Sequence, residues 1–134
     1  MKFCYRVTDA AFVHLRGIQR LNMDMCENIT DAAFAHLTGI KSLNISDCHL
    51  LTDAAFFHLD GIQELIMIDC RQDGITDAGF KHLRGIRYLD MGYCYQASIT
   101  DAALVNLRGI QTLIMTDCVP ERVLFAQQLG LNPV

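Results

Sequence analysis

One five-residue phrase, Thr-Asp-Ala-Ala-Phe, occurs five times along the 134-residue chain with small changes. The phrase starts at Thr8, Thr30, Thr52, Thr76 and Thr100, so the spacings are 22, 22, 24 and 24 residues. A near-constant period of this length indicates stacked units, because one short unit cannot bury its own apolar stripe without neighbours on either side. The repeat constrains the fold more strongly than any local propensity does.

Alignment on this phrase places the leucines, glycines and cysteines of the chain in columns. The two extra residues of the longer repeats fall within Arg71–Ile75 and Tyr95–Ile99. Variable length confined to one segment predicts a loop there and a fixed register elsewhere. The columns are Leu15, Leu37, Leu59, Leu83, Leu107; Gly17, Gly39, Gly61, Gly85, Gly109; Leu21, Leu43, Leu65, Leu89, Leu113; Met23, Ile45, Met67, Met91, Met115; and Cys4, Cys26, Cys48, Cys70, Cys94, Cys118.

Within each unit, the first half has the pattern of a strand. Leu21 and Met23 alternate with polar residues, which predicts one buried and one open face. The Cys column follows at the turn out of the strand. We expect its side chains to point inward, where a thiol acts as a small apolar group and a weak hydrogen-bond donor.

The second half of each unit has the pattern of a short helix of about two turns. Thr30 or Asp31 is a typical N-cap residue, and an acid in the first turn suits the helix dipole. Phe34 and Leu37 form an apolar stripe that would face the sheet. Gly39 is expected in a left-handed conformation after the last turn.

The pattern Ile18-x-x-Leu21-x-Met23-x-x-Cys26-x-x-Ile29, followed by Thr-Asp, resembles the leucine-rich-repeat signature. A cysteine replaces the more usual asparagine, as in the class found in F-box substrate receptors of ubiquitin ligases. The resemblance covers residues 1–118. It implies an α/β fold, a right-handed solenoid forming a short horseshoe arc, with a parallel concave sheet and short convex helices.

The two ends of the chain differ in sequence. Met1 aligns with Met23, so the chain is expected to begin inside a strand with a partial first repeat. We expect this bare end to favour self-association. Residues 119–134 read as a capping helix and tail, with Pro120 in the first turn and Gly130 after the last. Its apolar residues Val123, Phe125, Ala126 and Leu129 would cover the last repeat.

The cysteine and histidine columns suggest metal binding or disulfides at first sight. However, the chain has no Cys-x-x-Cys, and a metal site needs converging ligands, so we expect buried reduced thiols and a reducing cytoplasmic or nuclear compartment. The histidine column includes Asn106 in the fifth repeat, which favours hydrogen bonding or simple packing on the helix flank over metal binding. No cofactor or metal is expected. The column is His14, His36, His58 and His82.

Charge and hydropathy exclude further classes of function. The net charge of −4 disfavours nucleic acid, and no run of 18 apolar residues exists to span a membrane. Motifs for nucleophilic or zinc-dependent hydrolysis are absent from the sequence. We therefore do not expect an enzyme, although a metal-dependent enzyme using the histidine column remains an alternative.

The positions that the repeat leaves variable lie on the predicted concave face. Isoleucines and tyrosines stand there at solvent-facing sites with acids around them, which is typical of a protein interface for a partner with a basic patch. Their β-propensity alone is the other explanation. The candidate residues are Arg20, Asn22, Asp24, Asn44, Asp47, Glu64, Ile66, Ile68, Asp69, Tyr88, Asp90, Tyr93, Ile114 and Asp117.

Two functions are consistent with these patterns. The first is a protein-interaction module that binds a partner on its concave sheet, with substrate recognition in a ubiquitin-ligase-like complex as the setting that the resemblance implies. The second is a structural or engineered repeat scaffold without a ligand of its own, because the repeats are unusually alike. Variation concentrated on the sheet face favours the first.

Overall fold

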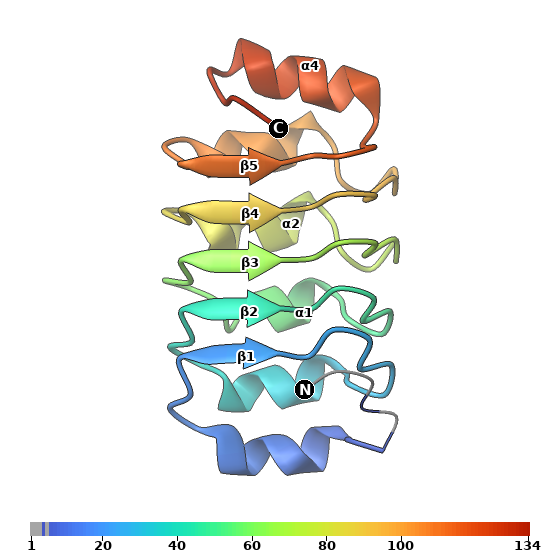
Figure 1. Cartoon of the computed structure of the whole chain (residues 1–134), viewed down its shortest axis with the longest axis vertical. Coiled ribbons are helices and arrows are strands. Elements are labelled where there is room, and N and C mark those ends of the chain that lie inside the picture. The colour runs from blue at the N-terminus through green and yellow to red at the C-terminus, as the bar shows by residue number, and fades with distance from the viewer. Residues whose placement is uncertain (1–3, 5) are drawn as a thin grey trace.

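The protein is an α/β solenoid, seen in a computed structural model that describes Cys4 and residues 6–134. Over these residues the chain forms one sheet of five parallel strands in sequence order, with the helices stacked behind it (Figure 1). Each strand is only three residues long. The strands are β1 (Arg20–Asn22), β2 (Ser42–Asn44), β3 (Glu64–Ile66), β4 (Tyr88–Asp90) and β5 (Thr112–Ile114).

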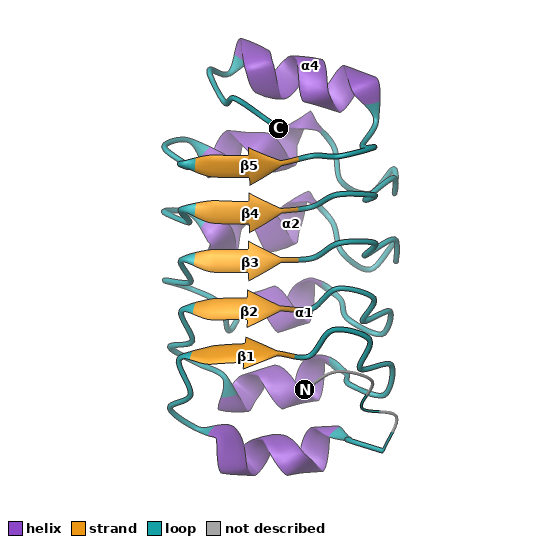
Figure 2. Ribbon diagram, viewed as in Figure 1, coloured by secondary structure: helices purple, strands orange, loops and turns teal. Residues whose placement is uncertain are grey.

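The helices begin at the Asp of each repeated phrase and cover one face of the sheet (Figure 2). The helices are short, as expected, and much of their hydrogen bonding is of the 3-10 type. Tight 3-10 turns are frequent in pieces this short. The elements are η1 (Asp9–Leu15), η2 (Asp31–His36), α1 (Asp53–Phe56), α2 (Asp77–Phe80), η3 (Lys81–Leu83), α3 (Asp101–Leu104), η4 (Val105–Leu107) and α4 (Pro120–Gln128).

The strand register follows the sequence columns. Leu21 pairs with Leu43, and the same column continues through Leu65, Leu89 and Leu113. The last four leucines are at most 2% exposed, whereas Leu21 at the first strand is half-buried. The apolar columns of strands and helices thus meet in one continuous core between the two layers.

The phrase acids lie in the first helical turn as predicted, and four of the five have a second role that the sequence did not predict. The Thr hydroxyl caps the helix, as at Thr52, whose Oγ1 accepts from the Ala54 N–H. The Asp31 carboxylate also reaches the next repeat, where it accepts from the Thr52 N–H at 2.8 Å and from the Thr52 hydroxyl at 2.6 Å. The equivalent bonds join Asp9 to Thr30, Asp53 to Thr76 and Asp77 to Thr100.

The cysteine column is buried as predicted from Cys26 onward, whereas Cys4 is half-buried. All six cysteines lie among the described residues and carry free thiols. Each thiol from Cys48 onward donates to a carbonyl of the preceding repeat, for example from Cys48 Sγ to Met23 O at 3.1 Å. The glycine after each helix has a positive φ, for example 87° at Gly39, which confirms its expected left-handed conformation.

At the C-terminal end, α4 lies over the last repeat with Ala126 buried and Leu129 half-buried against the core. Sequence reasoning missed Arg122, which is only 6% exposed and donates to Cys94 O and Gln96 O. The tail then pairs with β5, because Val134 N donates to Leu113 O. The expectation that Met1 lies within a strand falls outside the described residues. Across the described residues, no helix is both long enough and apolar enough to span a bilayer.

Candidate binding surface on the sheet

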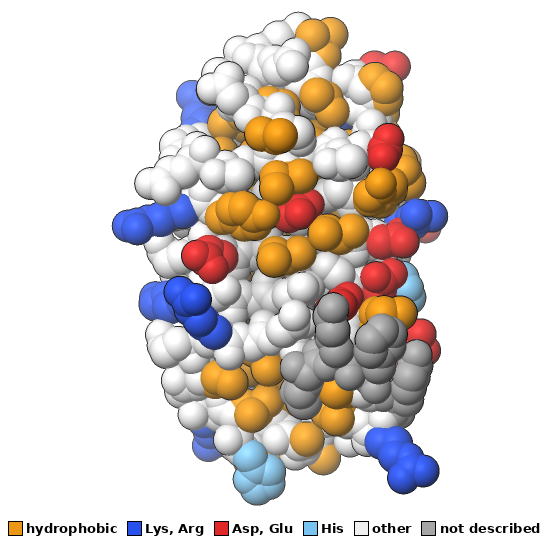
Figure 3. All heavy atoms as spheres, viewed as in Figure 1, with side chains coloured by type: hydrophobic (Ala, Val, Ile, Leu, Met, Phe, Trp, Pro, Cys, Tyr) orange, Lys and Arg blue, Asp and Glu red, His pale blue; other side chains and the backbone are white. Residues whose placement is uncertain are grey.

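The sheet face turned away from the helices, which we call the open sheet face, carries the residues that differ between repeats. Figure 3 views this face and shows apolar side chains gathered over the upper strands, with acidic groups in their midst. Every second strand residue points to this side, because side chains alternate along a strand. The repeat core accounts for the other side, so the open sheet face carries side chains that the core does not fix.

The centre of the open sheet face is an apolar patch interrupted by one carboxylate. Ile66 of β3 is in register with Asp90 of β4, which is in register with Ile114 of β5. All three are half-buried, as is Tyr88 two residues before Asp90. Ile68, also half-buried, follows β3 on the same side. The structure thus brings five of the predicted residues together in one patch.

The predicted site residues that follow the strands lie in turns, where the backbone takes an unusual conformation. Asp47, Asp69 and Asp117 have positive φ values between 51° and 57°, and Met25 and Tyr93 occupy the equivalent turns with φ of 61° and 60°. Asp tolerates this left-handed conformation better than most residues. Their recurrence therefore has a backbone cause in addition to any role in binding.

The side chains of these turn residues form an acidic rim along the patch. Asp69 makes an ion pair with Arg71, whose guanidinium lies 5.1 Å from the centre of the Tyr95 ring. Tyr93 hydrogen-bonds to Asp117, which raises the pKa of the tyrosine. Burial raises the pKa of Asp47, and the nearby Asp69 carboxylate adds to the effect.

Two residues of this rim, Arg71 and Tyr95, were missed by sequence reasoning. Each directly follows a column cysteine, at the start of a loop whose length varies between repeats. A search for columns cannot find them, because nothing repeats there. Tyr95 is 44% exposed and packs edge-on against Tyr93, with 6.4 Å between the ring centres.

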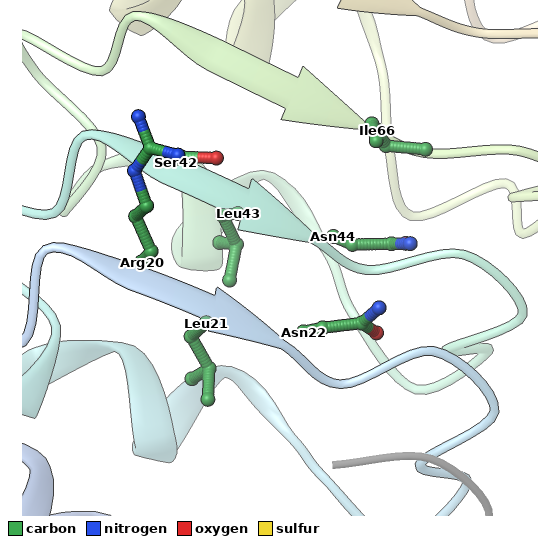
Figure 4. A pocket seen from close by; sticks show the side chains of 7 residues that line it. All are labelled: Arg20, Leu21, Asn22, Ser42, Leu43, Asn44 and Ile66. Carbon is green, nitrogen blue, oxygen red and sulfur yellow. The ribbon is translucent and has the colours of Figure 1, made fainter.

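The lower part of the open sheet face is polar. A shallow pocket of about 250 Å³ opens there, lined by Arg20, Leu21, Asn22, Ser42, Leu43, Asn44 and Ile66 (Figure 4). Asn22 and Asn44 each use Oδ1 to accept a backbone N–H two residues on, from Asp24 and Ser46 respectively. These predicted residues therefore shape the turn after their strand. Glu64 is exposed and lies in register with Tyr88, between the polar and apolar parts.

The histidine column forms hydrogen bonds between repeats. Arg16 donates to His36 Nδ1 at 3.3 Å, Asp60 and His82 are 2.9 Å apart, and Arg84 donates to Asn106 Oδ1. At His36, His82 and Asn106 the structure thus shows hydrogen bonding, one of the two roles predicted for this column. Among the described residues, no three His, Cys, Asp or Glu side chains converge as metal ligands would.

Comparison with known proteins adds to this description. No family model matches the chain, and no curated protein matches it in sequence. Among solved structures, the crystal structure of a Rad7 and Elc1 complex in yeast matches over 99% of this chain, with a TM-score of 0.73 and 15% identity. The match covers 39% of that chain, so this protein spans less than half the length of its structural neighbour. At this identity the match shows the fold alone, and that fold is an α/β solenoid of the leucine-rich-repeat type.

Proposed function

We propose that this chain is a non-catalytic protein-binding module that holds its partner on the open sheet face. The observation that carries the proposal is the patch of Ile66, Ile68, Tyr88 and Ile114, which are only half-buried on a face that the core does not need. Apolar and aromatic residues of this kind, surrounded by polar ones, are typical of the centre of an interface. The acidic rim favours a partner with a basic patch.

We propose further that the module serves in an assembly of the ubiquitin-ligase kind and works inside the cell. This proposal draws on the resemblance of the Cys-containing repeat to F-box substrate receptors. The structure with the same fold is a complex of two yeast proteins, so a solenoid of this shape does occur within a larger assembly. Buried, free thiols fit a reducing compartment.

Co-purification from a cell lysate tests the proposal. The wild-type chain is compared with a sheet variant, Ile66→Ala, Ile68→Ala and Tyr88→Ala, and with a helix-side variant, Val13→Ala, Phe57→Ala and Val105→Ala. The helix-side residues are 44–65% exposed, so their loss leaves the core intact. We expect one set of proteins to be retained by the wild type and the helix-side variant and lost by the sheet variant. Retention by all three chains would contradict the proposed site, and a retained set without ligase subunits would contradict the proposed setting.

A further inference from the structure

We propose that Asp90 is the anchor for one arginine or lysine side chain of the partner, whose aliphatic stem lies over Ile66 or Ile114. This inference rests on the proposed function, because it specifies what the open sheet face binds at its centre. Three observations support it. The turn after β4 does not need the charge of Asp90, the carboxylate lies between two isoleucines in the sheet, and Arg71 and Arg122 are bound to other groups.

The turn after β4 needs an oxygen at position 90 but not a charge. Asp90 Oδ1 accepts the Gly92 N–H at 3.0 Å. In the equivalent turns, Asn22 Oδ1 accepts the Asp24 N–H at 3.0 Å and Asn44 Oδ1 accepts the Ser46 N–H at 2.9 Å. A neutral amide therefore does this structural work in two other repeats of the same chain. The negative charge and the second oxygen of Asp90 are additions that the turn does not use.

The apolar surroundings would make this charge unfavourable once a partner covers it, unless the partner brings an opposite charge. Asp90 lies between Ile66 and Ile114 in the sheet register, and it is half-buried. Neighbouring parallel strands are about 4.8 Å apart, so an isoleucine stands on each side of the carboxylate at that spacing. A carboxylate at the edge of apolar groups loses hydration when a partner covers it, and it then needs a partner charge.

The chain itself does not supply that charge. Arg71 is held by Asp69 and the Tyr95 ring, and Arg122 donates to two backbone carbonyls beneath α4. Across the residues that the structure describes, no basic side chain forms a hydrogen bond or ion pair with Asp90. The charge of Asp90 also affects its neighbour Tyr88. Burial raises the pKa of Tyr88, and the negative charges of Asp90 and Glu64 raise it further.

The shape of the patch fits an amphipathic side chain. Lysine and arginine have long aliphatic stems that lie on apolar surface while the charged end reaches a polar group. Two residues beyond Asp90, Gly92 is buried and has no side chain. A Cβ at this position would lie 3.4 Å from Asp90 Oδ1, so the glycine adds no side chain of its own against the carboxylate. An arginine can in addition donate two parallel hydrogen bonds to one carboxylate. A bare cation would lack the converging ligands that a metal site needs.

Selection from a random peptide display library on the immobilised full chain tests this inference. We expect the enriched peptides to contain an arginine or lysine beside an aliphatic residue. The strongest one is synthesised and its affinity is measured for the wild type, Asp90→Asn and Asp73→Asn. Asp90→Asn keeps the bond to Gly92, as Asn22 and Asn44 do in their turns, so the fold is preserved. Asp73→Asn removes the same charge from an exposed loop residue.

We expect Asp90→Asn to bind about tenfold to a hundredfold more weakly, which corresponds to one charge-assisted hydrogen bond, and Asp73→Asn to bind like the wild type. Replacing the basic residue of the peptide by norleucine should cause a similar loss in the wild type and little further loss in Asp90→Asn. Equal affinity of wild type and Asp90→Asn, with binding lost in an Ile66→Ala, Ile114→Ala variant, would overturn the inference and leave the proposed function standing. Failure to enrich any peptide, or binding that neither set of changes affects, would overturn both.

Discussion

At the scale of single residues, the carboxylate of the repeated phrase joins each unit to the next. Asp53 Oδ1 accepts the N–H groups of Thr76 and Gly79, and its Oδ2 accepts the Thr76 hydroxyl at 2.6 Å. Bonds to a charged acceptor are stronger than neutral ones, and breaking them leaves partly buried donors unpaired. A solenoid of short strands thus gains a second connection between repeats on its helix side.

These Asp–Thr bonds between repeats predict that substitutions within the one column of acids will change stability by different amounts. Asp53→Ala should lower the free energy of unfolding by about 2–3 kcal/mol, because three hydrogen bonds to the next repeat are lost. Asp101→Ala is the matched control, since among the described residues the Asp101 carboxylate makes no bond to a following threonine of the kind that Asp77 makes to Thr100. It should cost less than about 1 kcal/mol through the helix dipole alone. Urea denaturation measures both, and equal losses would refute the bridging role.

The buried thiols predict a loss of stability in alkali. Burial raises the pKa of Cys48 and Cys94 to about 12, whereas thiols of an unfolded chain titrate near ~8.5. The stability that these thiols contribute is fully present below the pKa of the unfolded chain. It is lost as the pH rises from that pKa toward the pKa in the folded protein. At pH 10, each of the two thiols should therefore lower the free energy of unfolding by about 2 kcal/mol relative to neutral pH. Denaturation at pH 7.5 and pH 10 measures this, and a Cys48→Ala, Cys94→Ala variant with the same pH slope would contradict it.

The sequence columns predicted which residues are buried in the core. They did not predict the hydrogen bonds that join side chains of one repeat to the next. Leu89, Cys70 and Gly39 lie as expected, because a period alone decides which side chains face inward. The bridge from Asp53 to Thr76 was not foreseen, since a helix dipole also explains an acid in that position. At the surface, the columns placed Ile66, Asp90 and Ile114 side by side, but they could not reveal loop residues such as Tyr95.

At the scale of elements, α4 ends the stack by replacing the bonds that another repeat would make. Gln72 Nε2 donates to Cys48 O, and Gln96 Nε2 donates to Cys70 O. Arg122 of α4 continues this series by donating to Cys94 O at 3.0 Å and to Gln96 O at 3.1 Å. We therefore propose that residues 119–134 are a C-terminal cap, and that the buried Arg122 fixes its position on the last repeat.

The cap predicts that Arg122→Met is strongly destabilising although it keeps an apolar stem. Two buried carbonyls lose their donors, which should lower the free energy of unfolding by about 2–4 kcal/mol. Leu124→Ala on the same helix is the control, because Leu124 is 55% exposed and should change stability by less than about 0.5 kcal/mol. Thermal unfolding of the two variants compares them. Similar midpoints would mean that α4 adheres through its apolar residues alone.

At the scale of the whole molecule, the first repeat has a less complete core than the others. Leu15, Ile18 and Leu21 are half-buried, whereas Leu37, Ile40 and Leu43 in the next repeat are at most 2% exposed. We propose that this end self-associates, since contact there would bury the remaining apolar surface. Sedimentation velocity should show an average mass that rises with protein concentration and is insensitive to salt. A monomer at every concentration would contradict the proposal.

We propose that the open sheet face, rather than another surface of the described residues, binds the protein partner. The most direct measurement is the affinity of one co-purified partner for the wild type, for Ile66→Ala with Ile68→Ala, and for Phe57→Ala with Val105→Ala. Central apolar residues of an interface commonly contribute more than 1 kcal/mol each, so we expect the sheet variant to bind at least about tenfold more weakly. The helix-side variant should bind like the wild type. A loss confined to the helix-side variant would contradict the account.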